Sequence, residues 1–149
     1  MTSFWISGLK SAGKEFVNLS FYRTAAAIAV CQSEAPNIAE TVDREQGVRI
    51  GRTSDRLRNP RNQPPDRAVS PLANWPAEPV FLAARDGRLG VLLPVRLSPQ
   101  CQLCHGSPDK IPAPVRDALA SRYPQDQATG YTEGDLRGWF WVEVPPTAK

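Results

Sequence analysis

The segment Cys101-Gln102-Leu103-Cys104-His105 constrains this 149-residue chain more than any other feature. Two residues between the cysteines let one tight turn bring both thiols to the edge of the same porphyrin ring. The residue after the second cysteine then faces the metal at the centre of that ring. This C-x-x-C-H spacing is the attachment motif of a c-type haem, in which the thiols form thioethers and the histidine ligates iron. His105 is the sole histidine of the chain. The sequence therefore predicts one haem c per chain, bound at Cys101 and Cys104, with His105 as the proximal iron ligand.

Other interpretations of the motif fit less well. A thioredoxin-like dithiol normally follows a strand and opens a helix of a βαβ unit, and residues 94–99 do not have that pattern. A zinc site would combine Cys31, Cys101, Cys104 and His105 into a Cys₃His set. The adjacent Cys104 and His105 would then both have to face one tetrahedral ion, which strains the backbone. A Cys₃His zinc-binding domain is thus a remote alternative, as is an incidental group of buried thiols.

The residue inventory also limits the second axial ligand of the iron. The sole methionine is Met1 and a second histidine does not exist, so His/Met and bis-histidine ligation are disfavoured. A Cys31 thiolate, a lysine amine, a tyrosine, water or an empty position are left. A thiolate would stabilise ferric iron and lower the reduction potential. A small buried hydrophobe on a helix is the ordinary role of an unbridged cysteine, so the residues alone leave both roles of Cys31 open.

Composition places the chain among globular proteins, with 41% hydrophobic and 22% charged residues. The net charge of +3 is small, and acidic residues alternate with arginines, so a nucleic-acid partner is not predicted. No run approaches eighteen apolar residues, so no integral membrane segment is expected. We predict a single domain over residues 1–149, with an ordered core over about 11–145. The sequence specifies neither the redox partner protein nor the oligomeric state.

The expected location follows from the cofactor. Haem c is attached outside the cytoplasm, which predicts a periplasmic or otherwise extracytoplasmic protein. The apolar run over residues 25–30 is too short for the core of a typical signal peptide, and charged residues such as Lys10 and Arg23 interrupt the N-terminal region. We therefore expect a mature or trimmed form, or a misassigned gene start.

Hydrophobic periodicity and turn signals predict an α+β fold. Asp86-Gly87 between two apolar runs indicates a β-hairpin. Pro36 is expected to end the first helix, which then restarts over residues 37–44, and residues 55–70 are expected to form an irregular loop. The predicted helices cover residues 11–33 and about 112–123, and the predicted strands cover residues 48–54, 80–84, 88–97 and 139–144.

Several separated segments resemble a family of single-haem c-type domains with a PAS-like fold, the Tll-type haem-binding domains of unknown function. Members of that family occur alone or as the sensory part of bacterial signalling proteins. The resemblance covers about residues 25–145, which is far more specific than C-x-x-C-H alone. The segments are Ala27-Ile28-Ala29-Val30-Cys31 with Ala35-Pro36, Arg52-Thr53-Ser54, Arg58-Asn59-Pro60 with Asn62, Cys101 to Gly106, Tyr123-Pro124 with Asp126, Ala128-Thr129-Gly130-Tyr131, and Gly134-Asp135 with Arg137-Gly138.

This resemblance implies a fold and a ligand set. The fold is an antiparallel sheet flanked by helices, with one haem held covalently at Cys101 and Cys104 between sheet and helix. His105 is the proximal ligand, and the family's second axial ligand, a helix cysteine, corresponds to Cys31. One departure is Gly51, which stands where a second arginine before Arg52 is frequent in the family.

Arginines near these segments are candidates to bind the haem propionates, because a guanidinium pairs with a carboxylate in a bidentate manner. They are Arg52, Arg58 and Arg137, for each of which a solvated loop position is the simpler interpretation. Tyr131 and Trp141 are candidates to pack on the porphyrin, although aromatic residues at such positions are more often ordinary core.

The predicted function is low-potential electron transfer by a His/Cys-ligated cytochrome c. The alternative is a haem-based redox or gas sensor, in which a ligand change at Cys31 moves its helix. With His105 committed to iron, no second histidine is present for distal acid–base catalysis or for a Ser-His-Asp set. We therefore expect an electron carrier or sensor rather than an enzyme, with a weak peroxidase as the third-ranked alternative.

Overall fold

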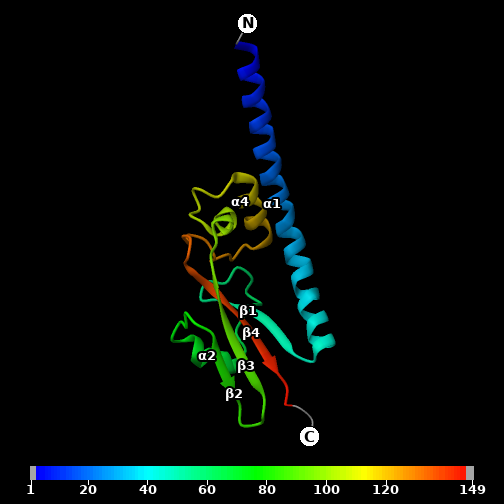
Figure 1. The fold of residues 1–149 in the computed structure, drawn as a ribbon, viewed down its shortest axis with the longest axis vertical. Coiled ribbons are helices and arrows are strands. Elements are labelled where there is room, and N and C mark those ends of the chain that lie inside the picture. The colour runs from blue at the N-terminus through cyan, green and yellow to red at the C-terminus, as the bar shows by residue number, and fades with distance from the viewer. Residues whose placement is uncertain (1–2, 147–149) are drawn as a thin grey trace.

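A computed structural model describes residues 3–146, without the side chains of residues 3–22 and of Cys31. Four antiparallel strands form one sheet, and a long helix runs beside it (Figure 1). The α+β class and the antiparallel sheet predicted from the sequence are confirmed. The elements in chain order are α1 (Ser3–Gln46), β1 (Arg49–Thr53), α2 (Asp66–Leu72), β2 (Val80–Ala83), β3 (Leu89–Arg96), the 3₁₀ turn η1 (Pro99–Cys101), α3 (Gln102–His105), α4 (Ala113–Arg122) and β4 (Leu136–Val144).

The sheet has the strand order β1-β4-β3-β2, so the last strand of the chain lies between the first and the third. The predicted hairpin is confirmed: Gly87 has a φ of 83° and donates its backbone N–H to the carbonyl of Ala84 at 3.0 Å. In β4, Trp139 and Trp141 are opposite Thr53 and Gly51 of β1, and opposite Pro94 and Leu92 of β3. Because β4 is paired on both sides, it joins the N-terminal and central parts of the chain into one sheet.

Helix α1 continues through Pro36, so the predicted break at this residue is wrong. A proline inside a helix removes one backbone hydrogen bond and crowds the preceding turn, which disfavours but does not forbid the helix. Contacts on both sides hold α1 in place here. Ile28 is buried against α4, and the Asp43 carboxylate accepts the backbone N–H of Ile50 at 2.9 Å. Tertiary packing therefore outweighs the local preference.

The segment over residues 55–70 contains the start of α2, so the prediction of an irregular loop is wrong for residues 66–70. Pro65 precedes the helix and Asp66 lies in its first turn, where a carboxylate interacts favourably with the helix dipole. Ala68 is buried against Leu92 and Trp139 of the sheet. The short helix therefore forms because it covers one face of the sheet.

The core is divided into three clusters, and the C-x-x-C-H motif packs against two of them. Cys104 packs on the cluster between α1 and α4, and Cys101 packs on a cluster beside the start of β4. The clusters consist of Ile28, Ile111, Val115 and Leu119; of Ala68, Leu92 and Trp139; and of Leu97, Ala128 and Tyr131.

Large apolar side chains are exposed on the sheet face away from α2, among them Phe81, Leu89, Leu93, Phe140 and Val144. In the described part of the chain, no helix is both long and apolar enough to cross a bilayer.

Candidate functional site

The motif forms two consecutive tight turns directly after β3. Cys101 ends η1, and α3 is the single turn from Gln102 to His105. Gly106 then donates its N–H to the Gln102 carbonyl at 3.0 Å, and a Cβ on residue 106 would approach that carbonyl to 2.7 Å. This turn therefore requires glycine. The Sγ of Cys101 lies 3.2 Å from the Ser98 hydroxyl oxygen.

The His105 ring is fixed in one orientation and one tautomer. Its Nδ1 lies 2.7 Å from the Ala128 carbonyl oxygen, which can only accept, so Nδ1 carries the hydrogen. Burial, followed by the Arg58 and Arg137 guanidinium groups, lowers the pKa of His105 to about 4. A neutral imidazole with a protonated Nδ1 presents its lone pair at Nε2, as in most metal-bound histidines. Arg137 Nε lies 3.3 Å from the same Nδ1, and because that nitrogen already donates to Ala128, we take this contact as electrostatic.

Arg58 lies in the loop after β1, and its guanidinium group binds the motif backbone. Its Nε donates to Asp126 at 2.9 Å, and its Nη2 donates to the carbonyls of Cys104 and Ala128. The ion pair is largely shielded, with side chains 14% and 12% exposed. Asp126 also accepts the backbone N–H of Ala128 at 2.7 Å. Arg58 and Asp126 therefore position both the motif backbone and the carbonyl that holds His105.

Arg137 approaches the motif from β4. It donates to the Ser54 hydroxyl at 2.7 Å and to the Arg56 carbonyl at 3.2 Å. Its guanidinium and that of Arg56 both lie over the Tyr131 ring, 5.4 Å and 3.7 Å from the ring centre. Burial lowers the pKa of Arg137. The structure thus brings two of the three predicted arginines, Arg58 and Arg137, to the motif.

Tyr131 stands edge-on to His105, with 6.3 Å between the ring centres. Its hydroxyl is buried and has no hydrogen-bond partner among the described residues. A buried donor without a partner costs roughly 1–3 kcal/mol, so this hydroxyl is suited to bind a polar group of a ligand.

Two of the predicted contacts do not form at the motif. Arg52 is exposed on β1, and none of its described contacts reaches the motif. Trp141 lies over Gly51, where a Cβ would overlap its ring, and it lines a cavity beside α2 instead. The tight contact with Trp141 also explains why glycine, rather than arginine, is accommodated at position 51.

Cys31 lies outside the described side chains, so its contact with iron stays a prediction. Its backbone belongs to α1, three residues after Ile28, and residues at this spacing share one helix face. Ile28 belongs to the cluster on which Cys104 packs. Two hydrogen bonds join this part of α1 to the end of α4. The side-chain amide of Gln32 donates to the Arg122 carbonyl, and the Arg122 guanidinium donates to the amide oxygen of Gln32.

The described side chains do not form a metal site of the zinc type. Among them, no group of three or more His, Cys, Asp or Glu gathers at one point. Cys101, Cys104 and His105 therefore do not converge as three ligands of a tetrahedral ion would.

The residue types alone predict no role for Arg56 and Asp126. Arg58 and Asp126 are 68 residues apart, and no local pattern connects them. Arg58 and Asp126 lie in segments that resemble the haem-binding family, whereas Arg56 lies in none of them.

Comparisons with known proteins identify a family and a fold. The family model of the Tll0287-like proteins matches residues 6–145. The chain belongs to the Tll0287-like family. A solved structure, described as the crystal structure of the cyanobacterial heme-protein Tll0287, is 21% identical and matches with a TM-score of 0.63 over 99% of both chains. The Tll0287-like fold therefore extends over almost the whole chain. No curated protein matches it.

Proposed function

We propose that this Tll0287-like protein binds one haem c through thioethers to Cys101 and Cys104, with Nε2 of His105 as the proximal iron ligand. The observation that carries this proposal is the hydrogen bond from His105 Nδ1 to the Ala128 carbonyl. It fixes the tautomer in which Nε2 is the electron-pair donor. The similarity to a structure described as a heme-protein supports the same cofactor.

The other residues of the site fit a group that carries two carboxylates. Arg58 and Arg137 place positive charge beside the motif, and the Tyr131 hydroxyl is a buried donor without a described partner. We assign Arg58, Arg137 and Tyr131 to the propionate side, and Arg52 only to longer-range electrostatics. The cations beside a neutral His105 also stabilise negative charge on the cofactor.

We assign Cys31 as the second axial ligand and electron transfer as the activity. The haem supplies an iron centre that accepts and releases one electron, and a thiolate opposite His105 would favour the ferric state. This makes the protein a low-potential, extracytoplasmic electron carrier. The position of residue 31 on the Ile28 face of α1 supports the assignment.

A haem-based redox or gas sensor is the second candidate function. It is supported by α1 itself, in which residue 31 belongs to one 44-residue helix whose N-terminal half extends beyond the rest of the molecule (Figure 1). A movement at residue 31 would be transmitted along this continuous helix.

Covalent haem is tested by expression with a c-type maturation system, acid-acetone extraction and a pyridine haemochrome spectrum. The unmodified chain should keep its chromophore after extraction, and Cys101→Ser/Cys104→Ser should lose it, with Ser107→Ala as a matched control. A colourless extracted chain would refute the proposal.

The second ligand is tested by electron paramagnetic resonance of the ferric protein. The Cys31→Ala variant should lose the low-spin thiolate signature, and an unchanged spectrum would exclude Cys31. Addition of CO to the reduced protein separates the two functions: an electron carrier keeps its spectrum, whereas a sensor exchanges its ligand.

A further inference from the structure

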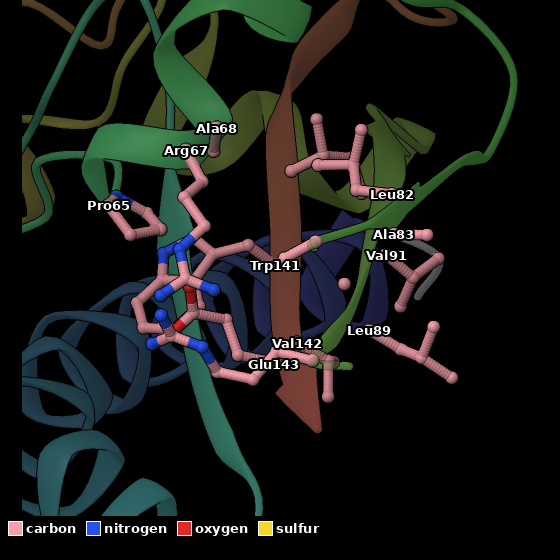
Figure 2. A pocket seen from close by; sticks show the side chains of 14 residues that line it. Pro65, Arg67, Ala68, Leu82, Ala83, Leu89, Val91, Trp141, Val142 and Glu143 are labelled. Atoms are coloured by element: carbon pink, nitrogen blue, oxygen red, sulfur yellow. The ribbon is translucent and has the colours of Figure 1, made fainter. Parts of the chain in front are cut away.

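A cavity lies between α2 and the sheet, away from the C-x-x-C-H motif (Figure 2). Its volume is about 360 Å³, within the range of small-molecule sites. It is lined by residues of α2, β2, β3 and β4, and none of the motif residues contributes. Its centre on β3 is near Gly90, whereas the motif follows the other end of that strand, which lies about 20 Å from Gly90 at 3.3 Å per residue. It is therefore a separate site.

The floor of this cavity is apolar and has a gap at Gly90. Leu82 is paired with Gly90 across the hairpin, and Leu92 and Trp141 continue the same face. A Cβ on residue 90 would lie 3.5 Å from Leu82 Cβ and 3.6 Å from the Val142 carbonyl, which are ordinary contacts. The strand therefore does not require glycine here, and the missing side chain leaves the cavity open. A glycine inside a strand often marks the approach of a ligand.

The rim of the cavity is charged. Arg67 reaches from α2 toward Glu143 on β4, with 3.8 Å between Nε and the carboxylate (Figure 2). Glu143 also pairs with Arg49 at 3.1 Å and is only 13% exposed. Arg88 lines the cavity and is paired with Asp86. Of the charged side chains that line the cavity, Arg67 and Arg88 are cationic and Glu143 is anionic, and the excess positive charge favours one added anion over a cation.

We propose that this cavity binds a small monocarboxylic acid with an apolar ring or branched body. The apolar body lies over Gly90 against Leu82, Leu92 and Trp141, and the carboxylate pairs with Arg67 and Arg88. A guanidinium binds a carboxylate with charge-assisted hydrogen bonds, and the apolar floor rewards burial of the body.

The proposal is tested with phenylacetate as the probe, titrated into the full-length chain by isothermal calorimetry. We expect saturable binding with one site, and at least tenfold weaker binding of 2-phenylethylamine, which has the same ring and the opposite charge. Absence of saturation by phenylacetate up to about 10 mM, corresponding to less than about 3 kcal/mol of binding free energy, would overturn the proposal. Equal affinity for the amine would also overturn it.

Variants locate the binding. Gly90→Leu fills the floor and should weaken phenylacetate at least tenfold, while Arg67→Gln should reduce the preference for acid over amine. Phe81→Leu is the control, because Phe81 is 80% exposed on the same hairpin and does not line the cavity. Thermal melting reports folding. If Gly90→Leu does not fold, the test rests on Arg67→Gln. An unchanged preference of Arg67→Gln for phenylacetate over 2-phenylethylamine refutes the site.

Discussion

At the scale of single residues, the chemistry of the site depends on how one carbonyl is held. The Ala128 carbonyl accepts from His105 Nδ1, and the Ala128 N–H donates to Asp126. The same carboxylate binds Arg58, which in turn donates to the Cys104 carbonyl. Asp126 therefore positions the imidazole and the motif backbone together.

Removal of this carboxylate should destabilise the fold. Asp126→Ala leaves Arg58 largely buried without a counter-charge, and the loss of one partner of a shielded ion pair costs about 3 kcal/mol. Urea denaturation followed by circular dichroism measures the effect. Arg49→Gln, which breaks a pair whose arginine is 67% exposed, should cost less than about 1 kcal/mol. Equal losses in the two variants would contradict a positioning role for Asp126.

At Gly51 the neighbouring Trp141 side chain, and not the backbone conformation, excludes a side chain. A Cβ would overlap the Trp141 ring, so Gly51→Ala should cost about 1–3 kcal/mol through overpacking and shift the tryptophan fluorescence. Gly90→Ala in the same sheet adds the same atom at an ordinary contact distance. Its stability, measured by thermal melting, should be unchanged or higher. If Gly51→Ala leaves the free energy of unfolding unchanged, Trp141 can move to accommodate the added methyl group.

At the scale of elements, local signals were sufficient where the structure is local. The Asp86-Gly87 turn fixes the β2–β3 hairpin, and the motif spacing alone brought Cys101, Cys104 and His105 onto consecutive turns. The helix α2 was not predictable, because it forms to bury Ala68 on strands that are distant in sequence. The contact between Arg58 and Asp126 had the same difficulty, since a pair far apart along the chain has no periodicity to reveal it.

The persistence of α1 through Pro36 leads to a prediction at this scale. Pro36 is exposed, so Pro36→Ala removes no packing and restores a backbone hydrogen bond to the Gln32 carbonyl. We expect a gain of about 1–3 kcal/mol in unfolding free energy by urea denaturation. Ile38→Ala, a substitution at an exposed position two residues further along the helix, should change stability by less than about 0.5 kcal/mol. A destabilised Pro36→Ala variant would indicate that the helix needs the proline geometry.

At the scale of the whole molecule, the motif connects parts of the core that are otherwise separate. Cys104 packs on the α1–α4 cluster and Cys101 on the cluster that contains Tyr131, whereas the cluster of Ala68, Leu92 and Trp139 lies elsewhere on the sheet. A covalent group at both thiols would tie the first two clusters together and leave the third unaffected.

The three clusters should differ in how far haem attachment stabilises them. In the chain expressed without haem maturation, amide hydrogen exchange should be faster in α4 and in α1 around Ile28 than in the matured protein. Exchange in β3 around Leu92 and in β4 around Trp141 should be unchanged, because α2 and the sheet pack without the motif. Mass spectrometry of peptic peptides measures both regions in one sample. The Phe81→Leu variant, matured with haem, controls for sequence effects outside the site. A uniform acceleration over the whole chain would show that the three clusters unfold as one unit and would contradict the division.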